Sequence, residues 1–196
     1  TEAETIARWI KPGSRVLDLG CGDGKLLKHL WQTRLAPGYG VEIDDAKVVE
    51  CIRNDVNVLQ LDLEDGLAAF ADRSFDYVIL SETLQAIHRQ EPLMREMLRV
   101  GREAIVSFPN FAYWPHRVAL ARGRMPVSKT LPYQWYDTPN VRCATIFDFE
   151  ELAAECGLEV LERVALAEGG RPVSFLPNLR GSLAVFRLRK KARPGL

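Results

Sequence analysis

The sequence predicts an α/β fold: a doubly wound, mostly parallel seven-stranded sheet with an antiparallel closing strand. The first observation is that apolar segments of strand length alternate with amphipathic segments of helix length through residue 110. Strict alternation is typical of a parallel sheet covered on both faces. The second is the length of 196 residues, which suits a single domain over 1–196.

The elements of the first half follow from these apolar segments and the breakers between them. The expected strands are residues 14–20, 38–44, 56–62, 74–81 and 103–110. The expected helices between them are residues 23–34, 45–54 and 92–100.

The second half departs from this alternation. We expect a helix over 147–157, stopped by Gly157, and then closing strands at 158–166 and 181–189 that form an antiparallel hairpin. The basic segment 190–195 is expected to be a frayed tail.

An aromatic loop insertion is expected at about 108–146, between the fifth strand and the last helix. A loop of this length inside a compact domain is usually functional. Its aromatic residues could form a lid over a ligand, a protein-binding surface, or packing of the loop onto its own core. These aromatic residues are Phe108, Phe111, Tyr113, Trp114, Tyr133, Trp135 and Tyr136.

Composition restricts the class of protein. The 26 basic and 26 acidic residues give zero formal net charge, which argues against nucleic acid as a partner. No apolar run is long enough to span a membrane, so no membrane association is expected. The four cysteines form no C-x-x-C pair, so we expect neither a metal nor a redox site, and scattered thiols fit a cytoplasmic location.

The glycine-rich stretch 16–27, VLDLGCGDGKLL, is typical of a nucleotide-binding turn. A Walker A loop is excluded because Leu19 stands where its first glycine belongs and Leu26 follows Lys25. A dinucleotide-binding loop needs a third glycine where Lys25 stands. Carboxylates at Asp18 and Asp23 would also repel a pyrophosphate, whereas they suit a ligand with positive groups.

S-adenosylmethionine is such a ligand, and the pattern D-x-G-x-G-x-G resembles motif I of the class I S-adenosylmethionine-dependent methyltransferases. The resemblance implies a Rossmann-like fold in which Glu42 holds the ribose hydroxyls and Asp62 accepts from the adenine amino group. It implies that S-adenosylmethionine or S-adenosylhomocysteine is held by Asp18, Gly20, Cys21, Gly22, Gly24, Glu42, Ile43, Asp62, Leu63 and Ser81.

The sequence contains few motifs that indicate catalysis. No [DN]-P-P-[FYW] motif follows the fourth strand, where SETL stands, and no Pro-Cys dipeptide offers a nucleophile. His88 is a weak candidate for a general base, and an ordinary exposed loop histidine is the alternative. Whether the chain is an enzyme is therefore left open.

Several longer blocks resemble the methionine biosynthesis protein MetW family, between about residues 6 and 166. The narrowest are REMLRVGREAIVSFPN (residues 95–110) and LPYQWYDTPN, whereas Glu82 stands where a shorter polar residue is expected. The resemblance implies a protein that supports MetX, the homoserine O-acyltransferase of methionine biosynthesis, as its partner. The alternative is a methyltransferase acting on an unidentified small molecule.

Overall fold

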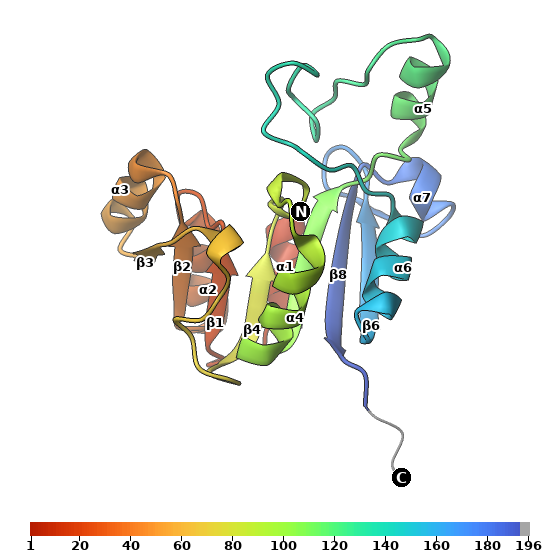
Figure 1. Cartoon of the computed structure of the whole chain (residues 1–196). Coiled ribbons are helices and arrows are strands. Elements are labelled where there is room, and N and C mark those ends of the chain that lie inside the picture. Colours follow the sequence, from red (N-terminus) through yellow and green to blue (C-terminus); the bar gives the residue numbers. More distant parts are fainter. Residues whose placement is uncertain (193–196) are drawn as a thin grey trace.

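The computed structural model describes residues 1–192, which form an eight-stranded sheet in the order β3-β2-β1-β4-β5-β8-β6-β7 (Figure 1). The first five strands pair in parallel, and β8 is antiparallel to both β5 and β6. This confirms the doubly wound fold with an antiparallel edge. The strands are β1 (Val16–Leu19), β2 (Gly38–Glu42), β3 (Asn57–Gln60), β4 (Phe75–Leu80), β5 (Gly101–Pro109), β6 (Leu158–Leu166), β7 (Pro172–Val173) and β8 (Leu183–Lys190).

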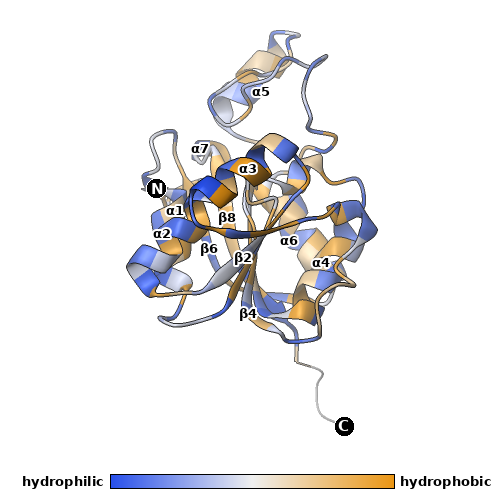
Figure 2. Ribbon diagram, turned by 90° about the vertical axis from the view of Figure 1, so that its left-hand side faces the viewer, coloured by the Kyte–Doolittle hydropathy of each residue, from blue (hydrophilic) through white to orange (hydrophobic). Residues whose placement is uncertain are grey.

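Helices cover both faces of the sheet: α1 and α2 lie on one side and α4 and α6 on the other (Figure 2). The expected helices are all present, whereas α1, α5 and α7 were not expected from the sequence, nor was the two-residue strand β7. The helices are α1 (Glu2–Trp9), α2 (Lys25–Arg34), α3 (Asp45–Arg53), α4 (Gln90–Val100), α5 (Trp114–Ala121), α6 (Ile146–Glu155) and α7 (Pro177–Arg180), with 3₁₀ turns η1 (Leu63–Asp65) and η2 (Leu84–Ala86).

Two apolar clusters form the core, one on each face of the sheet. Strand β4 shows how they are built, because Val78 and Leu80 enter one cluster while Tyr77 and Ile79 enter the other. This is the two-residue period of a strand buried on both sides. The core therefore fixes the carboxyl ends of β1, β2 and β4 relative to one another.

Helix α1 is held by its first turn and by its last residue. Thr1 and Glu4 form a reciprocal capping box at the start of the helix. At the other end, the Trp9 indole N–H donates to the Glu162 carboxylate on β6, at 2.7 Å. Ile6 is fully buried in the core between these ends. The helix is thus firmly seated, and this seating positions Glu2.

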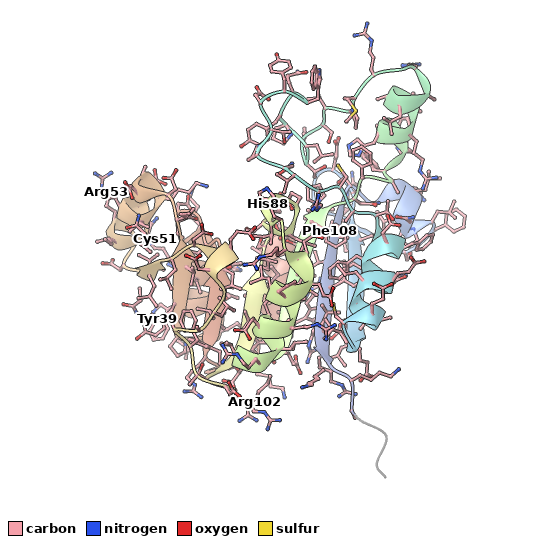
Figure 3. All side chains as sticks on the ribbon, viewed as in Figure 1. Tyr39, Cys51, Arg53, His88, Arg102 and Phe108 are labelled. Atoms are coloured by element: carbon pink, nitrogen blue, oxygen red, sulfur yellow. The ribbon has the colours of Figure 1, made fainter. Side chains whose placement is uncertain are left out.

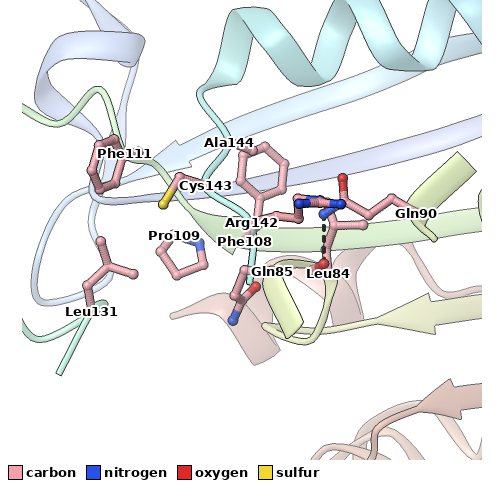
Figure 4. A pocket seen from close by; sticks show the side chains of 10 residues that line it. All are labelled: Leu84, Gln85, Gln90, Phe108, Pro109, Phe111, Leu131, Arg142, Cys143 and Ala144. Carbon is pink, nitrogen blue, oxygen red and sulfur yellow. Dashed lines mark hydrogen bonds between the residues drawn. The ribbon is translucent and has the colours of Figure 1, made fainter. Parts of the chain in front are cut away.

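The segment between α5 and α6 lies above the carboxyl ends of the strands (Figure 1). It is tied to η2, because the amides of Val141 and Arg142 both donate to the Gln85 carbonyl, at 2.9 and 3.0 Å. Beside these two hydrogen bonds is a small pocket between η2, the end of β5 and the segment. Leu131 and Cys143 of the segment are among the residues that line it (Figure 4). The segment is therefore anchored at the base while its outer part extends from the sheet.

The chain's C-terminal part agrees only partly with expectation. Lys190, expected in the frayed tail, is the last residue of β8. Residues 193–195 lie outside the described part of the chain. Among residues 1–192, no helix is long and apolar enough to cross a membrane.

Candidate functional site

A cavity of about 660 Å³ opens at the carboxyl ends of the parallel strands, within the size range of small-molecule sites. Its floor comes from the turn after β1, from the end of β2 and from the turn after β3. One wall is η2 with its flanking residues, and the roof comes from residues 129–140 of the α5–α6 segment. The expected site residues that line the cavity are Gly20, Glu42, Ile43, Asp62 and Leu63, together with His88.

The turn after β1 is shaped by glycine at a position where no side chain fits. Gly20 has φ +69°, and a Cβ built on it would lie 2.6 Å from the Thr83 hydroxyl oxygen. Its amide donates to the Val41 carbonyl at 2.8 Å, which joins the turn to β2. Glycine is required here both by the left-handed backbone and by the close approach of Thr83. The turn is therefore built to let backbone border the cavity.

The two acids of the turn have different roles. Asp23 faces outward and accepts from the Lys25 amide, and its pairing with the Lys25 side chain lowers the pKa of the carboxyl. Asp18 is buried in β1, and burial, with the nearby Glu2 and Glu42 carboxylates, raises its pKa to about 8. Only Asp18 is thus directed into the interior of the fold.

Glu42 is held in a fixed orientation at the end of β2. Its carboxylate accepts from the amides of Gly22 at 2.8 Å, Ile43 at 2.9 Å and Asp44 at 3.1 Å. The residue is buried yet lines the cavity. A carboxylate has about four acceptor positions, so one remains for a hydroxyl donor in the cavity. This arrangement suits a hydrogen bond from one hydroxyl of a sugar.

Asp62 begins the 3₁₀ turn η1, and its carboxylate accepts from the Glu64 amide at 2.8 Å. Leu63 follows it along the same wall of the cavity. An acid followed by a turn at this place can present an acceptor and an apolar side chain to a flat heterocycle. Both residues of the expected pair therefore line the cavity.

The remaining expected residues do not line the cavity directly. Asp18 is in β1, and Cys21, Gly22 and Gly24 are in the turn that follows it; none of them is among the residues that line the cavity. Cys21 is buried, with its sulfur 3.7 Å from that of Cys51, and Figure 3 shows Cys51 on α3. Ser81 is turned away toward α1, because its hydroxyl donates to the Glu2 carboxylate at 2.7 Å. These residues therefore do not form part of the cavity lining.

Two contributors near the site, Glu2 and Thr83, had no signal in the sequence, whereas Glu82 stood out as a longer polar residue than expected. Glu2 reaches the ends of β4 and β5 from α1, where it accepts from Ser81 and Ser107. Glu82 and Thr83 line the cavity on the side of the glycine turn. The sequence T-x-x-E at residues 1–4 is a capping-box signal that could have revealed α1. The tertiary placement of Glu2, however, has no local signal.

His88 lies after η2 at the mouth of the cavity, on the same edge as the ends of the parallel strands (Figure 3). Its amide donates to the Glu64 carboxylate at 2.7 Å, and its ring nitrogen Nδ1 is 3.4 Å from the same oxygen. The side chain is largely exposed. Within residues 1–192, no group of three or more His, Cys, Asp or Glu side chains is arranged to hold a metal ion.

The exposure of the aromatic side chains separates them into two groups. Phe108 and Tyr113 are buried, so part of the aromatic insertion packs onto its own core. Tyr133 lines the cavity roof and is half-exposed, whereas Trp135 and Tyr136 are 70% and 71% exposed. The same segment thus contributes both to the cavity and to the outer surface.

Solved structures with this fold are numerous among S-adenosylmethionine-dependent methyltransferases. One from Mesorhizobium loti superposes with a TM-score of 0.70, at 18% identity over 96% of this chain and 98% of its own. The [4+2]-cyclase SpnF superposes with a TM-score of 0.69, at 16% identity over 97% of this chain and 80% of its own. The fold is therefore that of class I methyltransferases, and the fold alone does not establish methyl transfer.

Sequence comparison is more specific. A bifunctional methionine biosynthesis protein MetXA/MetW of Rhodopirellula baltica is 38% identical over 98% of this chain, which spans only 33% of that protein. The chain spans 61% and 59% of two methyltransferase relatives, at 26% and 27% identity. The family model for methionine biosynthesis protein MetW matches residues 1–188. The chain belongs to the MetW family.

Proposed function

We propose that this chain binds S-adenosylmethionine, or its product S-adenosylhomocysteine, in the cavity at the carboxyl ends of the strands. The observation that carries the proposal is the fixed Glu42 carboxylate, buried at the cavity wall with three backbone amides orienting it. Glu42 would accept from a ribose hydroxyl, and Asp62 with Leu63 would border the adenine. The unpartnered Asp18 oxygen fits a ligand with positive groups.

We further propose that the chain acts by associating with MetX, the homoserine O-acyltransferase. Support comes from the relative in which MetXA and MetW form one polypeptide. Fusion of two proteins into one chain keeps them at high effective concentration, which favours pairs that work together. The role in methionine biosynthesis then follows from the partner rather than from methyl transfer.

The outer part of the α5–α6 segment is the surface that we assign to this partner. Trp135 and Tyr136 are its most exposed aromatic residues, and Trp114 and Met125 are about half-exposed. Large exposed aromatic side chains are typical anchors of protein interfaces. Between residues 111 and 145 there are five Lys or Arg residues and one Asp, in a chain with zero net charge. The partner face should therefore be apolar with an acidic rim.

The segment also offers a route by which ligand and partner could influence each other. Residues 129–140 roof the cavity, and Val141 and Arg142 are hydrogen-bonded to Gln85 of η2, which lines it. A ligand that fixes η2 and the roof would change the ensemble of the exposed part of the same segment. Such coupling requires different ligand affinities in the free and partnered states.

The decisive experiment measures acyl transfer to homoserine by the cognate MetX, alone and with this chain, each with and without S-adenosylmethionine. We expect the rate to change when the chain is added, and to respond to the ligand only in its presence. An unchanged rate with a chain that binds the ligand by calorimetry would refute the partnership. No ligand binding by folded chain would refute the cofactor assignment.

A second function is favoured by one observation: His88 and Tyr133 both line the cavity. They could receive a small acceptor molecule, which His88 would deprotonate as the methyl group is transferred. Conversion of S-adenosylmethionine to S-adenosylhomocysteine in the presence of a metabolite extract, lost in His88→Gln, would favour this alternative. Absence of turnover with MetX stimulation intact would favour the partner role.

A further inference from the structure

The two edge strands of the sheet differ in how well they are protected against pairing with another strand. At one edge, β7 is two residues long and begins with Pro172, which has no N–H to donate. At the other edge, β3 consists of Asn57, Val58, Leu59 and Gln60, and among residues 1–192 it pairs only with β2. Proteins usually protect such an edge with lysine, proline or a bulge, and β3 contains none of these. Its outer side is therefore open to another strand.

The backbone groups on this outer side follow from the pairing of β3 with β2. The Leu61 amide donates to the Glu42 carbonyl at 3.3 Å, so the odd-numbered residues of β3 face β2 and the even-numbered residues face outward. The N–H and C=O groups of Val58 and Gln60 therefore point away from the sheet. Within the described part of the chain, these groups have no hydrogen-bond partner on that side. An antiparallel strand would satisfy all of them.

Helix α3 presents an apolar centre between opposite charges at the same end of the sheet (Figure 1). Asp45, Val49, Ile52 and Arg53 recur at the spacing of one helix face, and all four are exposed. This face lies on the side of β3, because the Asp45 carboxylate accepts from the Gln60 side chain. Val49 and Ile52 are 46% and 64% exposed. The face thus has an acid at its start, apolar side chains at its centre and a base at its end.

Strand β3 and helix α3 are together complementary to themselves across a two-fold axis. If the axis passes beside Leu59, Val58 of each copy pairs with Gln60 of the other, and the two Leu59 side chains, each 40% exposed, come together. Helix α3 packs directly on β3, so the same axis brings the two α3 helices side by side and antiparallel. Asp45 of each copy then approaches Arg53 of the other.

We propose that a second copy of this chain docks on β3 and α3, which gives a dimer with one continuous sheet across the two β3 strands. The opposite charges at the two ends of α3 favour this occupant over an unrelated strand, because both charges find a partner at once. The α5–α6 segment lies toward the β5–β8 side of the sheet, away from β3, and stays free in this dimer (Figure 1). Substitutions at the dimer interface should therefore leave the effect of the chain on MetX unchanged.

The size of the interface sets the expected affinity. Each copy contributes a strand of four residues and one face of a helix of nine residues, so the buried area should be near the lower limit for specific complexes, about 1,200 Å². We therefore expect a Kd on the order of 10 μM. Sedimentation velocity of the full chain from about 1 to 200 μM, a range that brackets this Kd, should show a concentration-dependent shift from one chain to two.

The first variant is Leu59→Lys, which places two ammonium groups beside each other at the axis and supplies the usual protection of an edge strand. Leu59 is partly exposed, so the single chain should fold normally. We expect the Kd of the dimer to rise at least about tenfold, because like charges oppose each other. Leu120→Lys on α5, where the leucine is 44% exposed, is the matched control and should dimerise as the original chain does.

Charge reversal tests the antiparallel arrangement of α3. In Asp45→Arg two basic groups meet at each end of the helix pair, and in Arg53→Asp two acidic groups meet there. Each variant alone should dimerise at least about tenfold more weakly. An equimolar mixture of the two variants should recover the dimer, because each end then pairs one base with one acid. A folding defect in either variant cannot produce such recovery.

The contrary results are equally specific. A single chain at every concentration overturns the dimer, and an unchanged Kd in Leu59→Lys shows that any dimer forms through another surface. Weakened dimers that do not recover on mixing exclude the antiparallel contact of α3. If the β3 amides of a single chain become protected from hydrogen exchange only when MetX is added, the edge belongs to MetX and the second copy is refuted.

Discussion

The proposed binding of S-adenosylmethionine can be tested at one side chain, Glu42. Its carboxylate accepts hydrogen bonds from three backbone amides. The substitution Glu42→Gln would remove the charge and place a side-chain N–H donor against at least one of these backbone N–H donors. We expect the affinity for S-adenosylmethionine to fall about tenfold to hundredfold, as is typical when a charged hydrogen bond is lost. Calorimetry measures the change. Glu50→Gln, an exposed glutamate on α3, should bind normally, and equal loss in both variants would contradict the assignment.

Asp18 gives a prediction about stability and pH. Its pKa is raised to about 8 in the folded chain, against roughly 4 in an unfolded one, so the folded state holds an extra proton between these values. The free energy of unfolding should therefore decrease as pH rises, by about 1.7 kcal/mol from pH 6.5 to pH 8. Urea unfolding measures it. Asp18→Asn should flatten this dependence, and an unchanged slope in the variant would show that Asp18 does not titrate there.

At the residue scale, the sequence motifs predicted which acids and glycines belong to the site, but not which residues contact them in the fold. Asp18 lies within β1, and Glu42 and Asp62 lie at the ends of β2 and β3, so their places could be predicted from the apolar segments and the resemblance. Glu2 is 79 positions from Ser81 and 105 from Ser107, and such contacts depend on how α1 packs on the sheet. Glu82 was singled out as a departure from the expected pattern, and its left-handed backbone conformation depends on tertiary contacts.

At the scale of elements, the glycine turn offers a matched pair of substitutions. Gly20→Ala brings a Cβ to 2.6 Å from Thr83 at φ +69°, whereas Gly22→Ala, at φ +57°, meets nothing within 4 Å. Both pay for the left-handed backbone, about 1–2 kcal/mol, and only Gly20→Ala adds overlap, typically about 1–3 kcal/mol. Thermal unfolding should show the larger loss in Gly20→Ala. Equal losses would mean that Thr83 moves aside freely.

The exposed aromatic part of the α5–α6 segment predicts a loss of partner binding. Replacing Trp135 and Tyr136 together by Ser removes two side chains that are about 70% exposed, so the fold should be unaffected. We expect the effect of the chain on MetX to need at least about tenfold more protein, as for interface anchors. Ile52→Ser, an equally exposed apolar residue on α3, is the control. An unchanged response in the double variant would move the docking surface elsewhere.

Element positions were largely predictable, and the exceptions have physical reasons. The five strands of the first half are recognisable because their apolar segments are bounded by turn residues. Helix α1 was missed because it is short and supported by Trp9 and the core. Helix α5 was missed because its segment combines proline with exposed apolar residues and lacks a clear apolar face. In α1 the packing of the helix on the core therefore adds to its local capping box.

At the scale of the whole molecule, the ligand site and the proposed docking surface share one segment. Among residues 1–192, this segment touches the rest of the cavity through the hydrogen bonds of Val141 and Arg142 to Gln85. Binding of S-adenosylmethionine should stabilise the chain by about 2.7 kcal/mol at a ligand concentration of one hundred times the Kd. The distribution of that stabilisation is the more informative quantity.

Hydrogen exchange followed by mass spectrometry measures this distribution. We expect ligand to protect the amides of the glycine turn and the end of β2, and also those of residues 129–142, because the roof and its tie to η2 become fixed. The hairpin of β6 and β8, remote from the cavity, should exchange as before. If protection is confined to the glycine turn and β2, the ligand does not affect the proposed docking surface. Regulation of MetX by the ligand would then need another route. If the amides of the exposed aromatic residues are protected as well, the ligand and the partner both act on the α5–α6 segment. Coupling between two sites requires such a shared element with two states.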